Sequence, residues 1–111
     1  MSGANDPSDI LVKVRAAARE RLLFLPHAVK QMTRPERMIT AAAVEAVILN
    51  GELIEDYPED VRGHSCLLLG FEEDSGDPIH VVCSPKDEYL AVITAYRPKP
   101  EQWNEDFRQR S

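Results

Sequence analysis

The connections in the second half of the chain restrict its fold most, because they are too short to join parallel strands. Strand-like segments are predicted over residues 53–57, 64–71, 79–84 and 89–96. Pro58, the turn sequence EEDSGDP and Pro85-Lys86-Asp87-Glu88 separate these segments. A parallel crossover needs roughly a dozen residues or more. The sequence therefore predicts a four-stranded antiparallel sheet.

The first half of the chain has the residue spacing of helices. Ile10, Val14 and Ala17 lie on one face of a predicted helix that begins at Pro7, with Asp6 as its N-cap. The apolar run at residues 22–25 either ends this helix or forms a short buried strand. Periodicity does not decide between these two interpretations.

A second, short helix is predicted to begin at Pro26 and to end before Pro35. Its buried side is predicted to consist of Val29 and Met32.

A third helix is predicted over residues 40–50. Thr40 is its expected N-cap, and Ile39 and Val44 have the spacing of a hydrophobic staple. Asn50-Gly51 predicts a left-handed C-cap.

These elements predict one α+β domain of two layers, with N-terminal helices packed on one face of a four-stranded antiparallel sheet. The domain comprises residues 1–111, divided into an N-terminal helical extension (1–25), a core (26–98) and a C-terminal tail (99–111). Pro98 and Pro100 exclude a central strand in the tail. Trp103 and Phe107, four residues apart, are predicted to anchor a helical turn. The second sheet face is then open or covered by the tail.

The charge of the chain limits its ligands. The formal net charge is −6, and 43% of the residues are hydrophobic, as is typical of globular proteins. Residues 1–38 hold seven Lys and Arg against four Asp and Glu, whereas residues 39–111 hold six against fifteen. Because phosphate contacts drive nucleic-acid binding, a globally acidic chain is a poor general binder of nucleic acid. Any anionic ligand is expected to bind locally, at the basic N-terminal third. No apolar run could span a membrane and no signal peptide is recognised, so a cytoplasmic location is expected.

Common cofactor and hydrolase motifs are absent, including GxGxxG, GxxxxGK[ST], HExxH and GxSxG. No cofactor is therefore predicted. His64, Cys66 and Cys83 are residue types that bind metals, but structural zinc usually takes four ligands with a closely spaced pair. No metal site is predicted, and the two cysteines are interpreted as reduced core residues.

Acid–base chemistry on a phosphodiester is the remaining candidate. Metal-independent RNA cleavage needs a base for the ribose 2′-hydroxyl, an acid for the leaving oxygen, and cations for the charge of the phosphorane. Side chains of suitable types are His27, His80, Tyr96, Arg37 and Arg97. The same residue types also occur as capping, packing or solvated residues.

The register of the last two strands decides whether His80 can act together with Tyr96. If Ser84 pairs with Tyr89, the His80 and Tyr96 side chains point to opposite faces. If Cys83 pairs with Tyr89, they share one face. The sequence is compatible with both registers.

The order of several motifs resembles a small bacterial family, the domain-of-unknown-function family numbered 4258. HAVKQM is followed by RMI, VEAVILNGELIEDYP, a hydrophobic strand pair and VITAYRP, over residues 27–98. The family pattern has a His-Ala pair, Arg-x-Ile before a helix that ends in Asn-Gly, and a closing Ile-Thr-x-Tyr-x-Pro. The family often has glycine where this chain has Met38.

The resemblance implies a fold similar to RelE-type toxin ribonucleases and an endoribonuclease-like role, in a toxin–antitoxin or related regulatory setting. The family's motif residues correspond to His27, Arg37 and Thr94, with Tyr96 and Arg97 adjoining. RNA and a cognate antitoxin are the partners that the resemblance implies, and the oligomeric state stays open.

In the catalytic interpretation, His27 is the acid or base, and Tyr96 or His80 assists. Arg37 and Arg97 stabilise the phosphorane. The substrate-binding residues are Lys30, Arg34 and Thr94. His27, Arg37, Tyr96 and Arg97 are then expected to meet in one cleft. The alternative is a non-catalytic binding or regulatory module that uses the same basic patch and the open sheet face for a protein partner.

Overall fold

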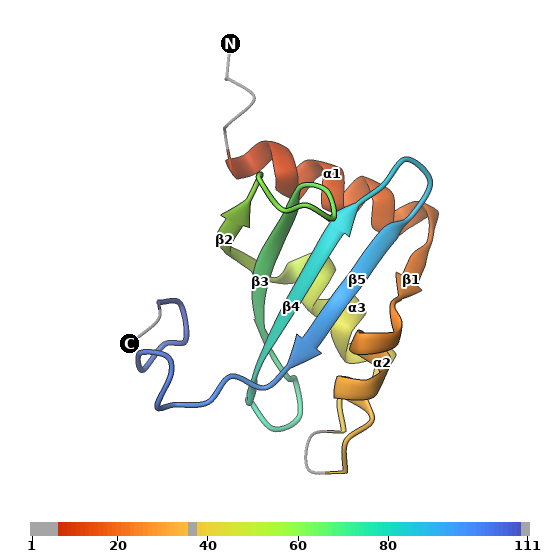
Figure 1. Cartoon of the computed structure of the whole chain (residues 1–111). Coiled ribbons are helices and arrows are strands. Elements are labelled where there is room, and N and C mark those ends of the chain that lie inside the picture. The colour runs from red at the N-terminus through yellow and green to blue at the C-terminus, as the bar shows by residue number, and fades with distance from the viewer. Residues whose placement is uncertain (1–6, 36–37, 110–111) are drawn as a thin grey trace.

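The computed structural model describes residues 7–35 and 38–109. Three helices pack on a five-stranded mixed sheet (Figure 1), which confirms the predicted α+β class. The helices are α1 (Pro7–Glu20), α2 (Pro26–Met32) and α3 (Ala41–Asn50). The strands are β1 (Leu22–Phe24), β2 (Glu52–Tyr57), β3 (Ser65–Phe71), β4 (Pro78–Pro85) and β5 (Leu90–Tyr96). Asp6, the predicted N-cap of α1, lies outside the described residues.

The strand order in the sheet is β1-β5-β4-β3-β2. Strands β2 to β5 form the predicted antiparallel meander. The prediction of a purely antiparallel, four-stranded sheet is wrong, because the apolar run after α1 forms β1, which pairs in parallel with β5. The parallel direction is allowed because α2, α3 and most of the meander separate β1 from β5 along the chain.

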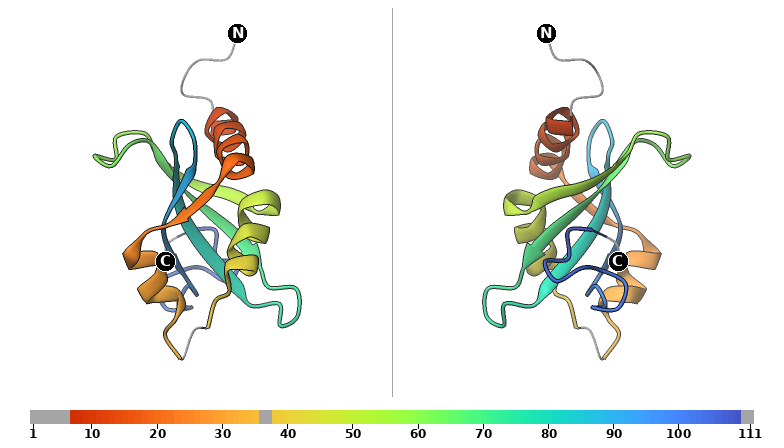
Figure 2. Two further views of the ribbon diagram at one scale, coloured as in Figure 1. Left: turned by 90° about the vertical axis from the view of Figure 1, so that its right-hand side faces the viewer. Right: turned by 90° about the vertical axis from the view of Figure 1, so that its left-hand side faces the viewer.

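One face of the sheet is covered by α1 and α3 (Figure 2). Ile10, Val14 and Ala17 of α1 are buried in the main core, as their spacing predicts. They belong to the same apolar cluster as Leu68 of β3 and Val81 of β4. The N-terminal helix is therefore an integral part of the core.

The two shorter helices bury a partly different set of residues from the one predicted. Ala28 and Met32 form the buried side of α2, four residues apart and therefore on one helical face. The prediction for Met32 is confirmed, but that for Val29 is wrong, since Val29 is 45% exposed. Ile39 and Val44 are both buried, as a hydrophobic staple requires.

The two ends of α3 are set by different residues. The Thr40 hydroxyl oxygen accepts a hydrogen bond from the Ala43 N–H at 3.0 Å, which confirms the predicted N-cap. The predicted left-handed C-cap is wrong, because Gly51 has an extended backbone with φ −76° and ψ 178°. Glycine is needed there for space, since an added Cβ would lie 2.4 Å from the Val47 carbonyl oxygen.

The C-terminal tail lies across the second face of the sheet, on the side opposite α3 (Figure 2). Trp103 is 3% exposed, and its ring lies against His80 with 4.4 Å between the ring centroids. Tail residues 99–109 contain turns and no helix. The predicted helical turn is wrong, and Phe107, with φ 62°, has a left-handed conformation that interrupts one. The predicted anchoring by Trp103 is confirmed.

A β-bulge sets the register between β4 and β5. Pairing runs from Pro85↔Leu90 to Cys83↔Val92, and then shifts so that Val82 pairs with Thr94 and His80 with Tyr96. Neither predicted register is observed. The extra residue on β5 changes which face the following side chains occupy, and it places Tyr96 directly opposite His80.

Cys66 and Cys83 face each other on adjacent strands and are fully buried, as core thiols. The hydrogen bond with Cys66, together with burial, raises the pKa of the Cys83 thiol well above its ordinary value. The Cys83 thiol therefore does not have the environment of an activated nucleophile. Among the described residues, no helix is long and apolar enough to cross a membrane.

Candidate functional site

Helix α2 carries His27 and Gln31 on one side. Pro26 occupies the first helical turn, where its fixed φ suits the helix and its missing N–H leaves no bond unmade. His27 and Gln31 follow at i and i+4 positions, so both side chains lie on the same helical face. Because Ala28 and Met32 pack inward and α2 packs against β5, this face lies beside the end of β5 (Figure 1).

The end of β5 and the start of the tail supply the other half of the site. Thr94 and Tyr96, two residues apart on one strand, share the second sheet face. Together with α2 they border a hollow of about 340 Å³. It is lined by His27, Gln31, Thr94, Tyr96, Arg97, Lys99 and Gln102. Its described lining contains no carboxylate, so the local charge is suited to an anion.

His80 lies behind this hollow and is 0% exposed. Its Nε2 is 3.0 Å from the Phe107 carbonyl oxygen, and its Nδ1 is 3.3 Å from the Tyr96 hydroxyl. Because a carbonyl only accepts, Nε2 carries a hydrogen, and in the neutral ring Nδ1 then accepts from the Tyr96 hydroxyl. His80 therefore orients Tyr96 but does not belong to the lining of the hollow.

Arg97 is held in place by an acidic residue outside the hollow. Its Nη2 is 2.9 Å from Oε1 of Glu72, and both side chains are 24% exposed. Glu72 follows β3 at the start of the β3–β4 hairpin, so this ion pair ties the hairpin to the end of β5. The pair fixes the position of the guanidinium and reduces the positive charge that it offers to a ligand.

Two of the other predicted site residues lie outside this hollow. Lys30 and Arg34 are not part of the lining of the hollow. Arg37 lies outside the described residues, so its predicted place beside His27 is not addressed. Of the four residues expected in one cleft, His27, Tyr96 and Arg97 do line a common hollow.

Sequence reasoning did not assign site roles to five residues at this end of the fold, one of which is Gln102 of the tail. Gln31 could have been found from its i, i+4 spacing to His27. Lys99 could have been found as a second cation two residues after Arg97. Trp103 and Glu72 act through contacts distant in sequence, which no local signal in the chain reveals.

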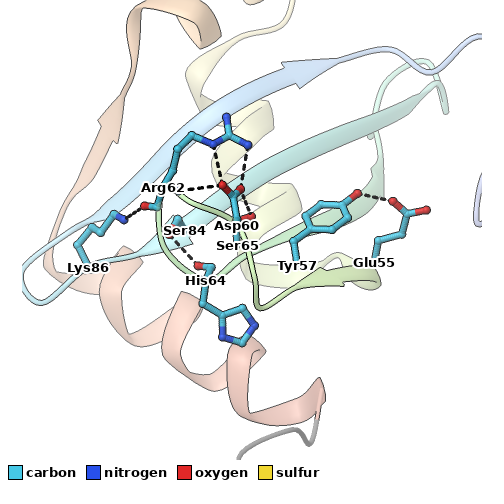
Figure 3. Close-up of polar contacts among 8 residues, drawn as sticks. All are labelled: Glu55, Tyr57, Asp60, Arg62, His64, Ser65, Ser84 and Lys86. Carbon is cyan, nitrogen blue, oxygen red and sulfur yellow. Dashed lines mark hydrogen bonds and ion pairs between the residues drawn. The ribbon is translucent and has the colours of Figure 1, made fainter.

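A second polar cluster lies at the turn between β2 and β3 (Figure 3). Asp60 Oδ2 is 2.8 Å from Arg62 Nη2 and accepts a hydrogen bond of 2.7 Å from the Ser65 hydroxyl. Side-chain and backbone hydrogen bonds from Arg62, followed by that from Ser65, hold the pKa of the Asp60 carboxyl well below its usual range. Lys86 joins the cluster through a 2.5 Å bond to the Arg62 carbonyl oxygen. The polar groups of this cluster are therefore paired with one another, an arrangement that holds the β2–β3 loop in one conformation.

His64, one of the three residues considered above as metal ligands, lies next to this cluster. Its Nε2 is 2.5 Å from Asp56 Oδ1, whereas Cys66 lies in the apolar core. Within residues 7–35 and 38–109, no three His, Cys, Asp or Glu side chains are grouped so that they could hold a metal ion.

A comparison with known protein families identifies the family of this chain. The family model described as "Domain of unknown function (DUF4258)" matches residues 24–97, which include α2 and all of β5. The chain belongs to this family. The matched region contains His27, Thr94, Tyr96 and Arg97 but excludes α1 and the tail. No curated protein and no solved structure matches the chain.

Proposed function

We propose that the hollow between α2 and the end of β5 binds a phosphodiester of single-stranded RNA and cleaves it without a metal ion. The observation that carries this proposal is the meeting of His27 from α2 with Thr94 and Tyr96 from β5 and with Arg97 just after it, in one lining without a carboxylate. With Lys99, the lining offers a histidine for proton transfer and two cations for the charge of the phosphorane. A RelE-like relationship of the fold is part of the same proposal and is supported by helices packed on an antiparallel meander.

His27 is the acid–base group of this mechanism. It takes the proton of the ribose 2′-hydroxyl, the O2′–P bond forms, and the P–O5′ bond breaks. The leaving O5′ takes a proton from water, which gives a 2′,3′-cyclic phosphate and a free 5′-hydroxyl. His27 then returns its proton to the hydroxide that this leaves. Histidine suits this step because its charge changes near neutral pH.

The other groups bind and orient. Arg97 and Lys99 stabilise the added negative charge of the phosphorane. With its own hydrogen directed to His80, the Tyr96 oxygen presents lone pairs to the hollow and accepts a hydrogen bond from the substrate. Thr94 offers a hydroxyl that can donate to a phosphate oxygen. His80 is a positioning residue, because it is buried and acts through Tyr96.

The principal alternative is a non-catalytic module that binds a protein partner at the same hollow. The acidic balance of the chain favours it, because a net charge of −6 opposes RNA association over distance. Glu72, Glu73 and Asp74 place three carboxylates in the hairpin from which Glu72 reaches Arg97. A partner with an anionic side chain or C-terminus would still fit the hollow.

Incubation of labelled single-stranded RNA with the purified chain in EDTA separates the two functions. We expect cleavage products that end in 2′,3′-cyclic phosphate, and a loss of about 100-fold or more in rate for His27→Ala. Lys30→Ala is the matched control, because Lys30 lies on the same helix and outside the hollow. The absence of cleavage by the wild type on every RNA tested would contradict the enzymatic proposal and leave the binding module.

A further inference from the structure

Helix α3 is apolar on the side that faces away from the sheet. Eight of its ten residues, in the sequence AAAVEAVILN, are Ala, Val, Ile or Leu. Val44, Val47 and Ile48 are buried against the sheet, whereas Ala42 and Ala46 are exposed and Leu49 is 41% exposed. A helix on the surface of a globular protein normally has a polar outer face, and one that is apolar all round is normally covered on both sides.

This apolar side continues into a groove of about 750 Å³ between α3 and β3. Ala42, Ala43 and Ala46 line one wall, and Gly70 and Phe71 line the other. Phe71 is 51% exposed, which is unusual for a large aromatic side chain of a strand. Alanines on the exposed side of a helix allow another helix axis to approach closely, as small residues do at helix–helix contacts. Figure 2 shows the β3–β4 hairpin curving toward this side of the molecule, below α3.

The rim of the groove is acidic. Its carboxylates are Glu52, Glu72, Glu73 and Asp74. Two of them already hold guanidinium groups of this chain: Arg108 Nε lies 2.9 Å and 3.0 Å from the two oxygens of Glu52, and Arg97 pairs with Glu72. No described cation pairs with Glu73 or Asp74, which are both exposed.

We propose that this groove binds a basic amphipathic helix of a partner protein. The apolar side of that helix packs on Ala42 and Ala46, and its Lys and Arg side chains pair with Glu73 and Asp74. The charge of the rim selects a basic partner, since like charges across an interface are repelled. A second copy of the chain is disfavoured, because a two-fold contact through this surface would bring its acidic rim against itself.

A model peptide tests the proposal with the full chain. The probe is a helical peptide of Leu, Ala and Lys, of about 18 residues, with Leu and Ala at i, i+3, i+4 and i+7 spacing. We expect amide chemical shifts to change at Ala42, Ala46, Gly70 and Phe71, with an affinity that falls as salt is added. The same peptide with Glu in place of each Lys is expected not to bind.

Two variants and two controls locate the contact. Glu73→Lys combined with Asp74→Lys is expected to weaken binding about tenfold. Ala46→Gln fills the groove while keeping a good helix former, and is expected to weaken binding as well. Asp87→Lys combined with Glu88→Lys makes the same charge change in the β4–β5 loop and is expected to leave binding unchanged. His27→Ala is also expected to leave it unchanged, so this surface is tested independently of the hollow.

Three results would overturn the proposal. They are unchanged amide shifts at the groove when the basic peptide is added, binding of the acidic peptide with the same affinity, and an equal loss of affinity in the variant with Asp87→Lys and Glu88→Lys. The amide spectrum of each free variant verifies that its fold is intact.

Discussion

Strand β4 presents Ile79, Val81 and Cys83 to the face covered by α1 and α3, and it presents His80 and Ser84 to the face crossed by the tail. All five side chains are buried, yet those of the second face are polar. Each of the two has a partner: His80 bonds to Tyr96 and Phe107, and the Ser84 hydroxyl donates to the His64 carbonyl oxygen at 2.7 Å. Buried polar groups must be hydrogen-bonded to be tolerated. The comparison indicates that β4 contributes apolar packing to the first face and hydrogen-bonded, oriented side chains to the second, which also buries Leu67 and Leu69 of β3.

The largest expected difference between the two faces is in packing energy. Leu68→Ala removes a fully buried side chain from the helix-covered face and is expected to lower the free energy of unfolding by about 2–5 kcal/mol. Thr94→Ala, on the second face and partly exposed, is expected to cost less than about 1 kcal/mol. Urea unfolding followed by circular dichroism measures both. A cost for Thr94→Ala as large as that for Leu68→Ala would remove the distinction between the faces.

The tail provides a second test, because a terminal segment can detach without unfolding the rest. Trp103→Ala removes the side chain that covers His80, and it is expected to cost about 1–3 kcal/mol, less than a core truncation that leaves a cavity. Hydrogen exchange is expected to rise at the tail and at the end of β5, while the amide of Leu68 stays protected.

Trp103→Phe is the control for this variant, since it keeps an aromatic ring against His80. It is expected to restore most of the protection. Uniform loss of protection throughout the sheet in Trp103→Ala would mean that the tail belongs to the main cooperative unit.

Much of the fold could be predicted from local sequence patterns. The spacing of Ile10, Val14 and Ala17, the cap at Thr40 and the short connections of the meander each depend on neighbours in sequence. The pattern could not assign β1, because its three residues form a strand only through pairing with β5. The same holds for Gly51, because an added Cβ would lie 2.7 Å from the carbonyl oxygen of Leu69, which is distant in sequence.

The candidate site could be predicted in part, for a related reason. Residue type and spacing bring His27 to one helical face and Thr94 and Tyr96 to one strand face. The contact between Tyr96 and His80 depends on a β-bulge, and a shift of one residue reverses the face of every side chain beyond it. Nothing in the residues of β5 marks the position of that bulge. The burial of His80 depends further on Trp103, 23 positions along the chain, in a segment without regular structure.

The polar cluster at the far end of the second face predicts a dependence of stability on pH. In the folded chain, the hydrogen bonds from Arg62 and Ser65 hold the pKa of Asp60 well below its usual range, whereas in the unfolded chain it is about 4. The folded state therefore gains stability above about pH 4 and loses it as the pH falls below that value. Asp60→Asn is expected to lower the urea midpoint at pH 7, by less than Trp103→Ala, and to reduce the difference between pH 7 and pH 3.

Asp74→Asn is the control for this effect, because Asp74 is exposed and lies at the opposite end of β3. It is expected to change neither midpoint appreciably. An unchanged pH dependence in Asp60→Asn would show that the cluster contributes to loop geometry alone.

The smallest expected effect is at Met38, in the segment that takes the chain from α2 to α3 on the helix-covered face. Met38 has φ 44° and is 64% exposed, while the neighbouring Ile39 N–H donates to the Met32 carbonyl oxygen at 3.0 Å. A left-handed backbone costs a non-glycine residue about 1–2 kcal/mol, and glycine avoids this cost but gains freedom in the unfolded chain. Met38→Gly is therefore expected to raise the free energy of unfolding by less than about 1 kcal/mol. Met38→Ala, which keeps the strain, is expected to give no such gain. A gain from both variants would indicate that the exposed Met38 side chain, and not the backbone, is unfavourable at this position.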